Sequence, residues 1–124
     1  MKNIILIMTF ISTFVACEAQ QNETIEILSA TEFNEAVKNK EVQLVDVRTP
    51  KEFKEGEIEE ALNIDFLQSE SFTTQFEKLD KEEPVYIYCR SGNRSGQAAQ
   101  KLQKMGFKEI YDLKGGYMNY PHKK

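Results

Sequence analysis

The sequence predicts one α/β domain with a mainly parallel central sheet. From Ile25 onward, short apolar stretches typical of strands alternate with longer amphipathic stretches typical of helices. The chain has 124 residues, of which 40% are hydrophobic, and this suits a single domain with its own core. In a sheet of this kind, ligands bind at the carboxyl ends of the strands.

The first strand and helix are predicted from a short apolar run and a capping pattern. Residues 25–28 read as a strand, and a helix follows Ser29 and runs to about Lys40. Ser29 and Glu32 have the spacing of a capping box, in which each side chain bonds the other residue's backbone N–H. The apolar residues of this helix share one face: Phe33, Ala36 and Val37.

The rest of the domain continues the alternation. Residues 42–47 form an apolar stretch that predicts a buried strand. Pro50 opens a short helix, because the first turn of a helix does not use its N–H, and Gly56 ends this helix. The later elements are a strand at 61–64, a helix at 69–79, a strand at 85–88, a helix at 94–105 and a strand at 109–113. Gly115 and Gly116 end the last strand.

The N-terminus has the pattern of an export signal. Lys2 precedes an almost unbroken apolar run at 4–15, and small and polar residues follow the run. The run is shorter than the ~20 residues that a membrane-spanning helix needs. A buried N-terminal helix or strand is the alternative, but the run has no polar side that would orient it.

Two cleavage sites fit this signal. The stretch Phe14-Val15-Ala16-Cys17 resembles the lipobox of bacterial lipoproteins, which makes Cys17 a candidate for lipidation. Cleavage after Ala19 would instead release a soluble protein. Either cut places the domain outside the cytoplasm, in the periplasm or on a membrane anchor that faces it. We therefore divide the chain into a signal peptide at 1–19 (or a lipoprotein signal ending at 16), a polar tether at 20–24, the domain at 25–120 and a tail at 121–124.

Charge and cysteine content narrow the function further. The net charge of −4 and the absence of a basic block argue against binding to nucleic acid. Processing at either site takes Cys17 out of use, so Cys89 is then the only free thiol and no internal disulfide can form. An unpaired cysteine in an oxidising compartment is a candidate reactive thiol. No heptad or apolar helix stripe predicts an oligomer, and we expect a monomer.

The stretch YCRSGNRSG places Cys89 at the carboxyl end of the fourth predicted strand. A loop with glycine follows, and a helix is predicted to start near Arg94. Loop amides, the helix N-terminus and two arginines would stabilise a thiolate at this position and bind an anionic substrate. We expect loop N–H groups to point at the sulfur and Gly92 to supply an unusual backbone angle. Cys89 is the predicted nucleophile, and the predicted substrate-binding residues are Arg90, Ser91, Gly92, Asn93, Arg94 and Ser95.

At this loop the sequence resembles the single-domain rhodaneses, which are sulfurtransferases. CRSGNRS is similar to their active-site loop, LVDVRTPKEFKEGEIEEALNID (44–65) to an upstream family segment and LKGGYMNY (113–120) to the closing one. The resemblance covers 25–120 and implies the rhodanese fold, a five-stranded central sheet with helices on both faces. Three features depart from the family: the usual Gly-His-Ile reads Gly56-Glu57-Ile58, the segment after it is acidic (Glu57, Glu59, Glu60) where the family often has Pro-Gly, and the usual closing Trp is Tyr120.

The resemblance implies a ping-pong sulfur transfer. Cys89 would attack the outer sulfur of a small anionic donor such as thiosulfate and carry the sulfur as a persulfide. An acceptor would then take this sulfur: cyanide in an assay, a thiol in the cell, or another protein. Arg90 and Arg94 would hold the donor, and the loop backbone would cradle the persulfide. No metal or organic cofactor is implied.

Asp46 and Arg48 precede the second helix and are predicted to support the site structurally. Asp46 would accept loop N–H groups, and Arg48 would pair with Glu52. His122 is expected in a frayed tail, which argues against a hydrolase that pairs cysteine with an oriented histidine.

Three other functions stay open at this point. Phosphatases and arsenate reductases of the related cysteine-loop type have five residues between Cys and Arg, whereas four separate Cys89 from Arg94 here. A persulfide carrier that turns over poorly alone would use the same loop. A scaffold without thiol chemistry would leave the polar, basic surroundings of Cys89 unexplained.

Overall fold

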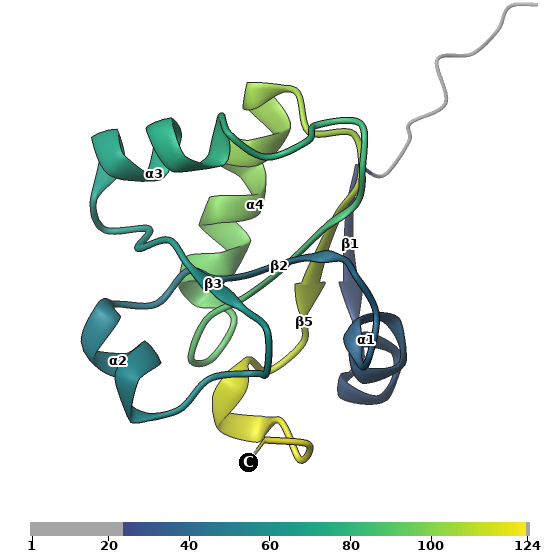
Figure 1. Ribbon diagram of the computed structural model, residues 1–124. Coiled ribbons are helices and arrows are strands. Elements are labelled where there is room, and N and C mark those ends of the chain that lie inside the picture. The colour runs from purple at the N-terminus through teal and green to yellow at the C-terminus, as the bar shows by residue number, and fades with distance from the viewer. Residues whose placement is uncertain (1–23, 124) are drawn as a thin grey trace, which may run out of the picture.

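The computed structural model describes residues 24–123 (Figure 1). Their five strands are β1 (Ile25–Leu28), β2 (Gln43–Asp46), β3 (Leu62–Asn63), β4 (Val85–Tyr88) and β5 (Ile110–Leu113). The strands form one sheet in the order β1-β5-β4-β2-β3, and each neighbouring pair is parallel. The predicted α/β class is therefore confirmed, and the sheet is parallel throughout.

The helices of this part of the chain are α1 (Ala30–Val37), α2 (Pro50–Glu55), α3 (Ser69–Phe76), α4 (Asn93–Met105) and the short 3₁₀ helix η1 (Tyr117–Asn119). Among residues 24–123, no helix has the length and apolar character needed to cross a membrane. The predicted signal peptide, Cys17 and residues 20–23 of the predicted tether lie outside the described residues.

Capping side chains set where the first two helices begin. Ser29 and Glu32 form the predicted capping box at α1, with Glu32 N–H 3.2 Å from Ser29 Oγ. Thr49 and Glu52 form a second capping box at α2, which the sequence analysis did not predict. The first helix ends at Val37, before the predicted Lys40, because Lys38 is extended and Asn39 has a positive φ of 56°.

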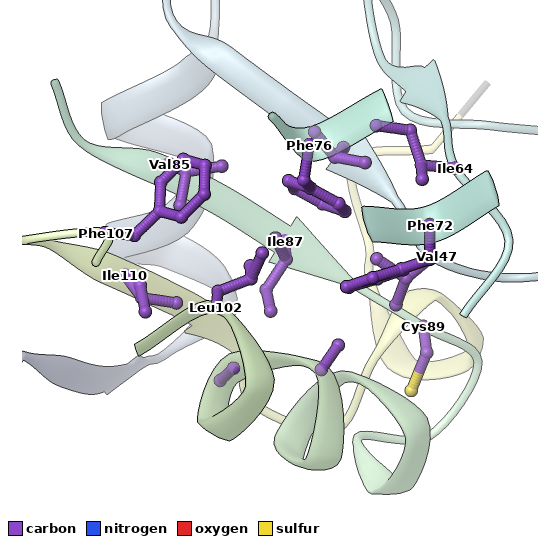
Figure 2. Packing of buried hydrophobic residues seen from close by; sticks show 13 residues of the cluster. Val47, Ile64, Phe72, Phe76, Val85, Ile87, Cys89, Leu102, Phe107 and Ile110 are labelled. Carbon is purple, nitrogen blue, oxygen red and sulfur yellow. The ribbon is translucent and has the colours of Figure 1, made fainter. Parts of the chain in front are cut away.

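Helices cover both faces of the sheet, as predicted (Figure 1). On one face, α3 and α4 pack on the strands through Phe72, Phe76 and Leu102. On the other face, α1 contributes Phe33 and Val37. Figure 2 shows the first of these two clusters, which includes Val85 and Ile87 of β4, Ile110 of β5 and also Cys89. Both faces of β4 are thus covered, and the chain leaves the sheet at the carboxyl end of this central strand.

Candidate active site

Cys89 directly follows β4 and lies at the edge of the apolar cluster beneath α4. Cys89 is 1% exposed. In Figure 2 the sulfur points away from the phenylalanines of the cluster and toward the end of α4. The Gly92 N–H donates a hydrogen bond to Sγ at 3.0 Å, and Sγ donates one to the Ser95 hydroxyl at 3.3 Å. The side chain is therefore buried among apolar residues while its sulfur has two polar partners.

The loop turns sharply because Gly92 adopts the left-handed conformation. Its φ is 106° and its ψ −11°, which L side chains rarely adopt. Gly92 is the N-cap of α4, and the helix begins at Asn93, one residue before the predicted start. This confirms the expected backbone role of Gly92 and brings the N-terminal end of α4 to the sulfur. Loop N–H groups were predicted to point at the sulfur, and in the structure the Gly92 N–H does so.

The segment after β5 is hydrogen-bonded to the backbone of the Cys89 loop and fixes its position. The backbone N–H groups of Tyr117 and Met118 donate to the carbonyl oxygens of Cys89 and Arg90 at 2.8 and 2.9 Å. A Cβ atom at Gly116 would overlap the carbonyl group of Arg90. This role of Gly116 goes beyond the strand-ending role that was predicted for Gly115 and Gly116. The two consecutive glycines were the available signal, since close backbone approach is one reason for a glycine.

Arg94 makes a two-pronged ion pair with Glu52 of α2. The distances are 2.7 Å from Nη1 to Oε1 and 2.9 Å from Nη2 to Oε2. The hydrogen bonds from Arg94 lower the pKa of Glu52 to about 2, so this carboxylate stays ionised at neutral pH. Hydrogen bonding to Glu52 raises the pKa of Arg94, and the charge of Cys89 adds to this effect. The guanidinium predicted to bind substrate therefore already has an anionic partner, and it lies within electrostatic reach of the thiol.

The predicted pairing of Arg48 with Glu52 is wrong. Arg48 pairs instead with Asp46, at 2.6 Å between Nη2 and Oδ2, and also donates to the carbonyl oxygen of Gly56. Asp46 is fully buried at the end of β2, only two residues away, whereas Glu52 is turned toward Arg94 by its capping bonds to Thr49. The predicted support role of Asp46 is confirmed in part, because it accepts the backbone N–H of Arg48 at 2.9 Å.

The other predicted loop residues differ in exposure. Arg90, Ser91 and Asn93 are exposed, and the Asn93 side chain accepts a hydrogen bond from Gln97 at 3.1 Å. Ser95 is fully buried and contacts the sulfur. Ser95 is thus a part of the site's interior, while Arg90, Ser91 and Asn93 lie at its surface.

Asp112 was not predicted to belong to the site. It is 4% exposed and lies on β5, beside the side chain of Ser95. Burial raises its pKa from 3.8 to about 6, although the bonds to Ser95 and to the Leu113 backbone lower it. An acidic residue within an otherwise apolar central strand, on the same face as Ile110, was the signal in the sequence.

Tyr120 and His122 lie at the C-terminal end of the described residues. His122, expected in a frayed tail, is exposed and places its ring 5.4 Å from the ring of Tyr120. Tyr120, which stands where the family usually has Trp, is buried and bonds Asn34 through its hydroxyl. Within residues 24–123, no three His, Cys, Asp or Glu side chains are grouped as metal ligands.

Known proteins resemble this chain in both sequence and fold. Thiosulfate sulfurtransferase GlpE from Coxiella burnetii is 38% identical over 90 residues, covering 73% of this chain and 81% of that protein. The uncharacterized protein YqhL from Bacillus subtilis is 38% identical over 117 residues, covering 94% of this chain and 89% of that protein. The crystal structure of a rhodanese-like domain protein from Staphylococcus aureus matches with a TM-score of 0.68 at 26% identity, covering 80% of this chain and 96% of that one.

The family comparison agrees with these relatives. Residues 29–123 match the rhodanese-like domain, and this range includes Asp46, the whole Cys89 loop and the Gly115-Gly116 segment. The chain belongs to the rhodanese-like domain family.

Proposed function

We propose that the protein is a rhodanese-type sulfurtransferase that moves a sulfane sulfur from a small anionic donor, such as thiosulfate, through a persulfide on Cys89. The observation that carries this proposal is the position of the Cys89 sulfur between the Gly92 N–H and Ser95, at the carboxyl end of β4. The similarity to a protein named thiosulfate sulfurtransferase supports it.

The proposed reaction has two steps. The Cys89 thiolate attacks the outer sulfur of thiosulfate, the S–S bond of the donor breaks, and sulfite leaves with the bonding electron pair. The new terminal sulfur on Cys89 carries the negative charge. An acceptor such as cyanide or a thiol then attacks this terminal sulfur, and the Cys89 thiolate is the leaving group. The Gly92 N–H and the N-terminal end of α4 favour negative charge at this place in both steps.

Arg94 is the residue that we propose for donor binding. It is a cation at the start of α4, where the helix dipole disfavours positive charge unless an anion compensates. Glu52 supplies that anion in this structure. Two oxygens of the donor's sulfonate group would make the same two-pronged contact with the guanidinium. Arg90, exposed on the same loop, would add positive charge at the entrance.

The test is turnover of thiosulfate and cyanide, followed as thiocyanate formed by the wild-type chain and by Cys89→Ser. Repeated turnover by the wild type alone supports a sulfurtransferase. A single stoichiometric loading of Cys89 without release to small acceptors would instead identify a persulfide carrier. If no donor transfers sulfur to Cys89, the proposal is overturned.

We also propose that the domain works outside the cytoplasm, because of the apolar run and lipobox-like stretch at the N-terminus. Expression with labelled palmitate would show a labelled product for the lipoprotein and an unlabelled, shortened product for soluble export. A full-length chain in the cytoplasmic fraction would contradict both.

A further inference from the structure

Asp112 is a carboxylate in an apolar setting. It lies on the face of β5 that α4 covers, together with Ile110. Its neighbours in register are Ile27 of β1 and Ile87 of β4, so neither adjacent strand offers it a charged partner. The residue is 4% exposed. A buried carboxylate of this kind is costly, and a structural reason alone does not account for it.

Ser95 lies between the sulfur of Cys89 and the carboxyl of Asp112. The Cys89 thiol donates a hydrogen bond to the Ser95 hydroxyl oxygen at 3.3 Å, and the Ser95 side chain is near enough to the Asp112 carboxyl to lower its pKa. Ser95 is fully buried, so water does not compete with either contact. A serine hydroxyl accepts and donates at the same time, which makes it a relay for a proton.

One oxygen of the Asp112 carboxylate is short of donors. Among the described residues, its buried Oδ1 atom has no hydrogen-bond partner. Burial raises the pKa of this carboxyl to about 6. A carboxylate that is short of donors in a low-dielectric site binds a proton more strongly than one in water, and is therefore a better base near neutral pH.

We propose that Asp112 is the proton acceptor for the Cys89 thiol and acts through Ser95. The S–H bond of Cys89 breaks and its proton moves to the Ser95 oxygen, while the proton of that hydroxyl moves to the Asp112 carboxylate. The negative charge passes from Asp112 to the sulfur, and the net charge of the site is unchanged. Ser95 then donates to the thiolate, beside the Gly92 N–H, and the protonated Asp112 donates to Ser95.

This relay supplies the thiolate that the proposed sulfur transfer requires, and in that sense it rests on the proposed function. In this relay Asp112 is the oriented base for Cys89, a role for which His122 was not expected to be placed. Asp112 must be ionised to accept the proton, so the relay operates above about pH 6. Arg94 interacts electrostatically with Cys89, and Arg94 and its partner Glu52 both keep their charge over this range. The buried residues of α4 are Ser95, Ala98, Ala99 and Leu102, none of which is charged.

The experiment is the alkylation of Cys89 by iodoacetamide, measured from pH 5 to pH 9 on the full chain. The modified peptide is quantified by mass spectrometry, so that Cys17 does not contribute. Asp112→Asn and Ser95→Ala should each slow alkylation at pH 7 by at least about tenfold. Each should also shift the increase of the alkylation rate with pH to higher pH. The alkylation rate of the double variant should fall no further than that of either single variant, because Asp112 and Ser95 act through one relay. Glu109→Gln removes an exposed carboxylate next to β5 and should match the wild type.

A rate for Asp112→Asn equal to or above the wild-type rate would overturn the relay, as would losses that add in the double variant. A variant that fails to fold is recognised by circular dichroism. In that case the wild type still gives an answer, through the ¹³C resonance of the Asp112 carboxyl. Its pH midpoint should shift when Cys89 is alkylated, and an unchanged midpoint would contradict the relay. Alkylation needs no sulfur donor, so this result is separate from success or failure of sulfur transfer.

Discussion

Arg94 pairs with the Glu52 carboxylate, and a negative charge on the sulfur of Cys89 would stabilise its positive charge further. An anionic donor that binds Arg94 therefore competes with Glu52. Because Glu52 has a pKa of about 2, acidification to pH 5 does not remove this competitor. The ion pair thus sets how much of the guanidinium is available to a donor.

Replacing Glu52 with Gln should strengthen donor binding. Glutamine keeps the capping box with Thr49 but loses the charge that holds Arg94. We expect the KM for thiosulfate to fall about fivefold, which corresponds to roughly 1 kcal/mol for a partly exposed ion pair. Steady-state kinetics of thiocyanate formation measure this. Glu55→Gln, an exposed carboxylate of the same helix, is the matched control. A KM that rises in Glu52→Gln while that of the control stays constant would show that Glu52 organises Arg94 for the donor.

At the scale of elements, the segment after β5 and the Cys89 loop form one unit. Two backbone hydrogen bonds join them, and Gly116 contacts the backbone of Arg90 without room for a side chain. Its φ of 67° adds a second reason for glycine. The loop geometry is therefore set by β5 and η1 as well as by its own residues.

Gly116→Ala should displace the loop. The new Cβ overlaps the Arg90 carbonyl, so the hydrogen bonds of Tyr117 and Met118 to the loop must lengthen or break. We expect the free energy of unfolding to fall by roughly 1–3 kcal/mol and kcat/KM to fall at least about tenfold. Urea unfolding and turnover measure the two effects. Gly96→Ala, where a Cβ meets no atom within 4 Å and the residue lies inside α4, should instead raise stability by about 0.5–1 kcal/mol. Equal effects of the two substitutions would show that Gly116 has no special role.

Asp112 makes the stability of the α4–β5 layer depend on pH. Its pKa is raised from 3.8 to about 6, so the folded protein holds this proton more tightly than the unfolded chain. Wild-type stability is therefore lost as pH rises from about 4 to about 6, by up to roughly 3 kcal/mol. Asp112→Asn lacks this loss, and its stability relative to the wild type should increase over that interval and level off above about pH 7. Urea unfolding of both proteins at pH 4 to 8 tests this, and a difference that does not change with pH would contradict it.

At the scale of the whole molecule, periodicity and caps predicted most of the fold. The strand at Val85–Tyr88 has its predicted bounds, and the Ser29–Glu32 cap is present. These features depend on neighbours along the chain. The end of α1 was placed too late, although Asn39 is of a residue type that often adopts the left-handed conformation at helix ends. The ends of β2 and β3 and the start of β5 differ from their predicted bounds by one residue, since hydrogen bonds to other strands decide where pairing stops.

The site could be predicted only as far as its residues are close in sequence. Cys89, Gly92 and the start of α4 belong to one loop, and their arrangement follows from the local pattern. The contact between two distant segments was missed: Glu52 pairs with Arg94, which lies 42 residues further along the chain. Arg48 pairs with the nearby Asp46 and not with Glu52. Pairings of this kind depend on which segments the sheet brings together.

The most informative single measurement is the intact mass of the chain after incubation with thiosulfate, for the wild type and for Cys89→Ser. The wild type should gain the mass of one sulfur atom and lose it again when cyanide is added, with thiocyanate as the product. Cys89→Ser should gain nothing. A wild-type mass that does not change with thiosulfate, or an adduct that also forms on Cys89→Ser, would contradict sulfur transfer through a Cys89 persulfide.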